Sequence, residues 1–242
     1  MTVNDWNAIA ASYAQIECDT RRQFLFPALL AALPAVSGGT VLDFGCGCGD
    51  LVIPLAKRFH RVIAHDPAPR MLERARRGWD ESHCPGAVEF LVDTRDIPDA
   101  EVDVGLASLV FQTIEEPDRI LAALEEIARI LRPDAPLLIA MSHPCFQFET
   151  IAASRYGDNG SPIAVTLGEL RFLDYHRPLS AWVALFATAG WVIRGLSEVY
   201  DEPSYYRNRG LQPSRFAGKL PLFLVVEMKI GQSVHRDEEQ SK

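Results

Sequence analysis

The stretch Val41-Leu42-Asp43-Phe44-Gly45-Cys46-Gly47-Cys48-Gly49-Asp50 decides the fold, because a short apolar run leads through an acid into three glycines at alternate positions. Glycine adopts backbone angles that other residues avoid, and it lets main-chain N–H groups approach a ligand closely. A strand that ends in such a turn and continues into a helix is typical of a nucleotide-binding βαβ unit. The stretch therefore predicts an α/β protein with a ligand site at the end of this strand.

The spacing of the glycines narrows the choice of ligand. A dinucleotide site follows G-x-G-x-x-G, but Asp50 takes the place of the last glycine when the pattern is counted from Gly45 and Gly47. A phosphate loop ends in G-K-[ST], and no lysine follows Gly49. The acids in the stretch would also repel a triphosphate. A glycine loop flanked by acids suits a ligand that carries positive charge.

At Asp43, Gly45, Gly47 and Gly49 the chain resembles the class I S-adenosylmethionine-dependent methyltransferases, whose first motif is an acid followed by glycines at alternate positions. The later motifs of that family follow in order, and the resemblance covers roughly residues 5–228. Asp66 ends a second apolar run 17 residues after Gly49, near the ~20-residue spacing at which an acid reaches a ribose.

The resemblance implies a Rossmann-like methyltransferase fold, which is a doubly wound α/β sheet of seven strands, mostly parallel with the last strand antiparallel. Apolar runs predict the strands at 41–43, 61–65, 87–92, 103–110, 137–141, 191–193 and 220–228. Helices are expected at 5–13, 51–59, 118–131 and 178–189. In such a sheet the ligand lies beyond the carboxyl ends of the strands.

Five segments are expected along the chain. They are an N-terminal helical lid (1–37), a cofactor-binding core (38–145), a lid or helical insertion over the acceptor pocket (146–177), the C-terminal half of the sheet (178–231) and a flexible tail (232–242). The third segment is too long for an ordinary connection between two elements. The tail is polar, and we expect it to fray.

Composition fits one cytoplasmic α/β domain. The 242 residues are 48% hydrophobic, which is enough for a sizeable core, and no apolar run reaches the ~18 residues that a membrane span requires. The five cysteines show no zinc-site spacing, so no metal is expected. A net charge of −8 argues against nucleic acid as a partner. We expect a monomer or a homodimer that binds a small molecule.

S-adenosylmethionine is the cofactor that the resemblance implies, with S-adenosylhomocysteine as the product. Tyr13 is expected to close over it, although packing on the core is the alternative for an amphipathic tyrosine. Asp66 is expected on the ribose hydroxyls, Met71 against the adenine ring and Asp93 on the adenine amino group. The candidates for cofactor binding are Tyr13, Asp43, Gly45, Cys46, Gly47, Asp66, Pro67, Met71, Asp93, Thr94 and Ser108.

Two residues are candidates for catalysis. His143 follows the fifth strand, where this topology places its chemistry, and an imidazole titrates near neutrality, so it is suited to take a proton from the acceptor. The alternative is a histidine hydrogen-bonded into the turn that Pro144 creates. Gln112 is expected to hold the acceptor or, alternatively, to bond its own backbone. Tyr175, His176 and Tyr205 are candidates for the aromatic walls of the acceptor pocket.

The sequence thus predicts a methyltransferase that acts on a small organic acceptor by direct displacement. A second hypothesis is a regulator or scaffold that binds the cofactor without turnover, because a fold does not impose a function. The third hypothesis, a nicotinamide-dependent oxidoreductase, is disfavoured by Asp50.

Overall fold

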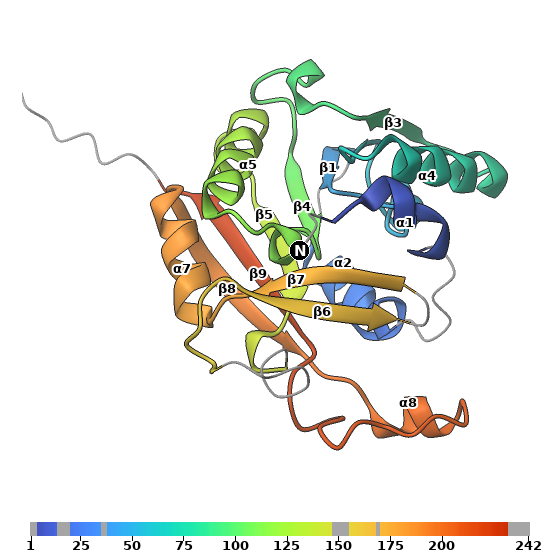
Figure 1. Ribbon diagram of the computed structural model, residues 1–242. Coiled ribbons are helices and arrows are strands. Elements are labelled where there is room, and N and C mark those ends of the chain that lie inside the picture. Colours follow the sequence, from blue (N-terminus) through green and yellow to red (C-terminus); the bar gives the residue numbers. More distant parts are fainter. Residues whose placement is uncertain (1–3, 14–19, 35–37, 147–154, 168–169, 232–242) are drawn as a thin grey trace, which may run out of the picture.

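A seven-stranded sheet forms the centre of the protein (Figure 1). The computed structural model describes residues 4–13, 20–34, 38–146, 155–167 and 170–231. The strands lie in the order β3-β2-β1-β4-β5-β9-β8. The pairs among β1 to β5 are parallel, whereas β9 is antiparallel to both of its neighbours. The predicted doubly wound sheet with an antiparallel last strand is confirmed.

Most of the predicted elements form close to their expected bounds. The strands of the sheet are β1 (Thr40–Phe44), β2 (Arg61–His65), β3 (Ala87–Leu91), β4 (Val104–Ser108), β5 (Leu137–Ser142), β8 (Trp191–Val199) and β9 (Phe223–Ile230). The α-helices are α1 (Trp6–Tyr13), α2 (Phe26–Ala32), α3 (Val52–Ala56), α4 (Pro69–Ser82), α5 (Pro117–Ile130), α7 (Leu179–Thr188) and α8 (Pro203–Arg207). Single turns are η1 (Arg21–Leu25), η2 (Thr94–Asp96) and η3 (Phe111–Thr113). Proline opens α4 and α5, where its missing N–H costs no hydrogen bond.

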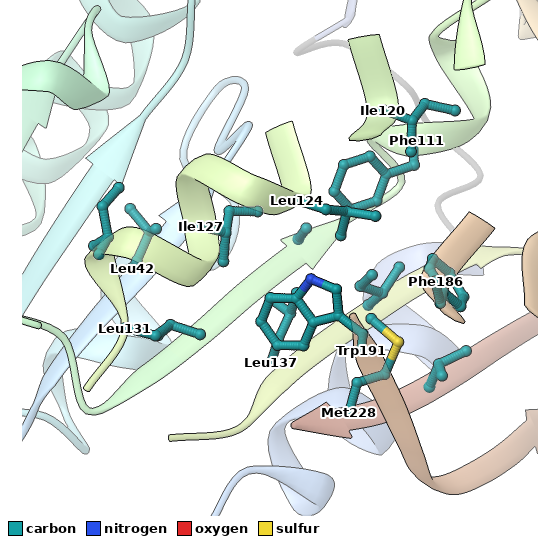
Figure 2. Close-up of a cluster of buried hydrophobic side chains, with 14 of the residues drawn as sticks. Leu42, Phe111, Ile120, Leu124, Ile127, Leu131, Leu137, Phe186, Trp191 and Met228 are labelled. Carbon is teal, nitrogen blue, oxygen red and sulfur yellow. The ribbon is translucent and has the colours of Figure 1, made fainter. Parts of the chain in front are cut away.

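The core consists of two apolar clusters on opposite faces of the sheet, because strands that are covered on both sides carry apolar residues at every position. One cluster lies under α5 and α7, and Figure 2 shows Leu124 and Ile127 of α5 packed toward Leu137 and Trp191 of the sheet. The other cluster joins α2 and α3 to the opposite face, with Leu29, Leu55 and Val41 fully buried. The carboxyl ends of the parallel strands are thereby held in fixed positions around one edge.

Residues 146–177 were expected to form a lid or a helical insertion, and the described residues 155–167 and 170–177 contain no helix. Ser161–Leu167 (β6) and Leu170–His176 (β7) form an antiparallel hairpin instead, which pairs only with itself and lies outside the main sheet (Figure 1). Side chains at 163, 165 and 166 are β-branched, and such residues favour strands. Residues 147–154 and the predicted tail at 232–242 lie outside the described residues.

Two strand boundaries also differ from the prediction. β9 begins at Phe223 rather than at residue 220, because Pro221 has no N–H to donate to the ladder. β8 continues to Val199, six residues past its expected end, and its pairing with β9 shifts register by one residue at a bulge between Ile193 and Gly195. None of the helices in the described ranges is both long enough and apolar enough to cross a membrane.

Candidate active site

The glycine loop folds back over the end of β2. The N–H groups of Gly45 and Cys46 both donate to the carbonyl oxygen of His65, each at 2.8 Å. Gly45 has a φ of +74°, and a Cβ on it would lie 2.5 Å from Cγ2 of Val110. Glycine is therefore required at position 45 both by the backbone angle and by the space.

Gly49 lets the loop pack directly on α4. A Cβ on this glycine would lie 2.8 Å from Cβ of Ala75 in that helix. Gly49 thus does the work that the last glycine of a dinucleotide motif does, although it stands one residue earlier. Asp50 instead points to the N-terminal segment, where its carboxylate bonds Arg22 and lies 3.6 Å from Arg21.

The carboxylate of Asp66 holds the loop and the start of α4 together. One oxygen accepts from the N–H of Gly47 and the other from the N–H of Ala68, both at 2.9 Å. Asp66 is buried, and this burial raises its pKa above the ordinary value. Its remaining lone pairs face a cavity, so the residue is placed to accept hydrogen bonds from a ligand.

That cavity, called the chamber below, has a volume of about 340 Å³, which falls in the range of small-molecule sites. It lies at the carboxyl ends of β1, β2 and β4, under α1. Its walls are mostly apolar, with few polar groups. The lining residues are Asn4, Trp6, Tyr13, Phe44, Gly45, Gly47, His65, Asp66, Pro67, Met71, Ser108, Leu109, Val110, Thr113, Ile114, Arg119 and Ala123.

A smaller acidic cavity of about 40 Å³ continues from the chamber and shares Tyr13, Gly45 and Gly47 with it. Asp43 lines this cavity, and its Oδ2 is buried with no hydrogen-bond partner among the described residues. Burial, with smaller contributions from the charges of Asp66 and Asp50, raises the pKa of Asp43 to about 7. A positively charged ligand group would offset this repulsion, so the residues present fit an adenosyl ligand with a sulfonium.

The pKa of Asp43 makes stability depend on pH. The folded-state pKa lies above the ordinary 3.8, so this carboxyl stabilises the fold at low pH, and its contribution is lost as pH rises toward about 7. We compare the free energy of unfolding of an Asp43→Asn variant with that of the parent protein, both without ligand. The advantage of the variant is expected to grow by about 2–3 kcal/mol from pH 5 to pH 8. Urea unfolding of both proteins at the two pH values measures this difference. If the difference in free energy of unfolding between the two proteins is the same at both pH values, the raised pKa of Asp43 is contradicted.

α1 covers the chamber through its aromatic side chains. The ring of Tyr13 packs edge-on against Trp6, with 6.1 Å between centroids, and its hydroxyl accepts from Arg21. Met71 lies at the base of this cover, with its sulfur 3.4 Å from Sγ of Cys48. Tyr13 and Met71 thus both line the chamber.

Two predicted cofactor-binding residues lie outside the chamber. Asp93 follows β3 as expected, but its carboxylate accepts from the guanidinium and the N–H of Arg95, the latter at 2.9 Å. Thr94 is buried beside it at the start of η2. Neither residue is among the described residues that line the chamber. Cys46 lines the acidic cavity, and Ser108 lines both, with its Oγ buried and without a partner in the described chain.

The two catalytic candidates occupy different surroundings. His143 is buried at the end of β5, where its Nδ1 accepts from the N–H of Cys145 at 3.2 Å and its Nε2 lies 3.4 Å from Glu198 of β8. Burial lowers the pKa of His143, and the carboxylate of Glu198 opposes that shift. Gln112 is buried in η3, next to Thr113 of the chamber, and its Oε1 has no partner among the described residues.

The three acceptor-wall candidates are all buried, and none is among the described residues that line the chamber. Tyr175 on β7 donates to Glu115 at 3.1 Å, and Nε2 of His176 lies 2.9 Å from the carbonyl oxygen of Tyr156. Tyr205 lies on α8, where it packs against Phe24 and beneath the guanidinium of Arg209. The structure therefore brings Tyr175 and His176 together on the hairpin and leaves Tyr205 apart from them.

Several chamber residues were not predicted from the sequence. Phe44 and His65 are paired neighbours at the ends of β1 and β2, with 4.8 Å between ring centroids. Phe44 directly precedes Gly45, and His65 directly precedes Asp66. Their positions at the ends of strands could therefore have indicated that they line the site. Burial lowers the pKa of His65 to about 4, which keeps its imidazole neutral. Asn4 and Arg119 carried no comparable signal. Among the described residues, no group of three or more His, Cys, Asp and Glu side chains is placed to hold a metal.

Comparison with known proteins agrees with this geometry. Residues 41–134, from the glycine loop to the end of α5, match the family model described as "Methyltransferase domain". This part of the chain is therefore similar to known methyltransferase domains. Among solved structures, a SAM-dependent methyltransferase from Aquifex aeolicus superposes with a TM-score of 0.62, covering 91% of this chain and 98% of that chain at 20% identity. At this identity the likeness shows the fold.

Two curated relatives carry more specific names. The malonyl-[acyl-carrier protein] O-methyltransferase of Serratia marcescens is 33% identical over 144 residues, which are 59% of this chain and 50% of that protein. The carboxy-S-adenosyl-L-methionine synthase of Escherichia coli is 30% identical over 117 residues, or 46% of each chain. The chain thus spans about half the length of these two relatives.

Proposed function

We propose that the protein transfers the methyl group of S-adenosylmethionine to a small organic acceptor. The observation that carries this proposal is the union of the acidic cavity at Asp43 with an apolar chamber at Asp66, around one glycine loop. A nucleoside suits the apolar walls and the Asp66 carboxylate, and a cation suits the buried acid. The class of domain matched by residues 41–134 supports the same assignment.

The chain's own residues contribute positioning and exclusion of water. The bound cofactor would supply an electrophilic methyl group on a positively charged sulfur. Gly45 and Gly47 let the backbone approach the ligand, Asp66 accepts hydrogen bonds from it, and Trp6 and Tyr13 shield the chamber from solvent. Holding two reactants at attack distance in a dry site accounts for up to ~7–11 kcal/mol of a barrier. Little covalent help from side chains is then required.

The acceptor is proposed to approach past Gln112 and η3, because this turn borders the chamber and carries a buried amide oxygen without a described partner. The relatives' names support an acceptor other than nucleic acid, since one acts on malonyl-[acyl-carrier protein] and another is a carboxy-S-adenosyl-L-methionine synthase. The net charge of −8 supports the same class of acceptor.

For His143 the surroundings support the structural alternative over the role of general base. Its Nδ1 is the acceptor of the Cys145 N–H, and loss of this partner leaves a donor unsatisfied in the turn. We expect His143→Ala to lower the free energy of unfolding by about 1–3 kcal/mol and to leave turnover and cofactor affinity nearly unchanged. Urea unfolding and initial rates measure the two effects. A rate loss of ~10²-fold or more with an intact fold would restore the base role.

Calorimetric titration with S-adenosylmethionine, S-adenosylhomocysteine and NADH tests the proposal directly. Micromolar binding of the first two and none of NADH is expected. Binding of NADH alone would contradict the proposal. A cofactor-binding regulator or scaffold is the second candidate, because a fold does not impose a function. Persistent cofactor binding without turnover of any small acceptor would favour it.

A further inference from the structure

Asn4 joins three separate parts of the structure through one side chain. Its Nδ2 donates to the carbonyl oxygen of Leu173 at 2.8 Å, and its Oδ1 accepts from the N–H of the same residue at 2.7 Å. Nδ2 also lies 3.4 Å from the carbonyl oxygen of Thr113. The amide thus takes the place of a neighbouring strand on the outer edge of β7, and it does so from just before α1.

The hairpin has no described residue on the wall of the chamber, whereas Asn4 and Trp6 are both on it. Trp6 reinforces the link, because its ring lies 5.5 Å from that of Phe172 on β7 and 6.1 Å from that of Tyr13. A ligand in the chamber touches α1 on one side, and α1 holds the hairpin on the other. The effect of a bound ligand on the hairpin must therefore pass through neighbouring elements.

A second connection lies just after the carboxyl end of β7, four residues beyond Leu173. Arg177 is buried, and its guanidinium donates to the carbonyl oxygens of Ile114 and Glu115 at 2.9 and 2.6 Å. This anchor does not involve α1. The hairpin is thus attached to the core at Arg177 and to the N-terminal cover at Leu173, and only the second attachment depends on Asn4.

We propose that Asn4 is a positioning residue that couples α1, which covers the chamber, to the β6–β7 hairpin. Filling the chamber with the adenosyl cofactor then orders the hairpin. This inference rests on the proposed function. The hairpin borders η3, the turn with Gln112, so an ordered hairpin completes the acceptor side of the site. The charge-neutral amide is required, since both a donor and an acceptor face Leu173.

Hydrogen exchange of the full chain, with and without S-adenosylhomocysteine, tests the coupling. In the parent protein we expect the ligand to slow exchange in residues 45–50 and also in residues 161–173. In Asn4→Ala the ligand should still protect 45–50, but protection of 161–173 should fall roughly tenfold, as loss of two hydrogen bonds predicts. Asn4→Asp should behave like Asn4→Ala, because its carboxylate has no donor for Leu173 and Thr113.

Asn7→Ala is the matched control. Asn7 lies in α1, three residues after Asn4, and its Oδ1 accepts from the N–H of Arg70 in α4 at 3.1 Å, so this change loosens α1 without touching the hairpin. Ligand-dependent protection of 161–173 should persist in that variant. Protection at 45–50 without any at 161–173 in the parent protein, or equal protection of 161–173 in Asn4→Ala, would overturn the coupling alone. No protection at 45–50 would overturn the proposed function and the coupling together.

Discussion

Gly45→Ala is expected to lose detectable cofactor binding and to lower the melting temperature by roughly 5–15 °C. The new Cβ would lie 2.5 Å from Cγ2 of Val110, at a φ of +74°. The backbone angle alone costs about 1–2 kcal/mol for an L-residue, and an overpacked contact adds about 1–3 kcal/mol. Relief of the contact must move either the loop or Val110, and both line the chamber. Calorimetric unfolding and titration with S-adenosylhomocysteine measure the two losses.

Gly47→Ala separates the two causes. Gly47 has a φ of +55°, but nothing lies within 4 Å of the position its Cβ would take. Only the backbone angle destabilises this variant, so we expect its melting temperature to fall by a smaller amount, roughly 2–8 °C. Equal losses in the two variants would show that the close contact with Val110 does not matter.

Asp66→Ala is expected to weaken binding of S-adenosylmethionine by about 100-fold or more. Hydrogen bonds to a charged group contribute about 1.5–3 kcal/mol each, and a ribose offers two hydroxyls. The same substitution releases the N–H groups of Gly47 and Ala68, so the loop loses its link to α4 as well. Titration calorimetry gives the affinity.

Asp80→Ala is the control for Asp66, because Asp80 is an exposed acid on α4 and is not among the described residues that line the chamber. The affinity of Asp80→Ala for S-adenosylmethionine should match that of the parent protein. An unchanged affinity in Asp66→Ala would remove Asp66 from the binding site.

The cofactor loop could be predicted from the sequence because its function resides in local backbone chemistry. Gly45 and Gly47 act through their own N–H groups and angles, and Asp66 binds residues 19 positions before it and 2 positions after it. The alternation of apolar runs and helices predicted a doubly wound sheet, and the family resemblance implied its antiparallel last strand. These features can be predicted without knowing any contact between residues that are far apart in the sequence.

The remaining site depends on contacts between distant parts of the chain. His143 stands at the predicted strand end, yet Glu198, 55 residues later, determines what its Nε2 faces. Asp93 also follows its strand as predicted, but the rotamer that pairs it with Arg95 has no sequence signal. Length alone marked residues 146–177 as an insertion, and the alternation within 161–176 was the signal for a hairpin. Asn4 meets Leu173 across 169 residues, which no local pattern indicates.

The hairpin exchanges no ladder hydrogen bonds with the main sheet, since β5 passes its edge directly to β9. The segment between β5 and α7 could therefore be replaced by another segment without breaking the hydrogen-bond ladder of the main sheet. A replacement segment would inherit the seven-stranded scaffold and the chamber, and its design would have to replace the contacts of Phe172 with Trp6 and of Tyr175 with Glu115 and to keep two hydrogen-bonded joints. One is a buried guanidinium at position 177, and the other is an outward-facing peptide group at position 173. Altered acceptor selectivity would then be sought in a graft of this segment, with the rest of the chain left untouched.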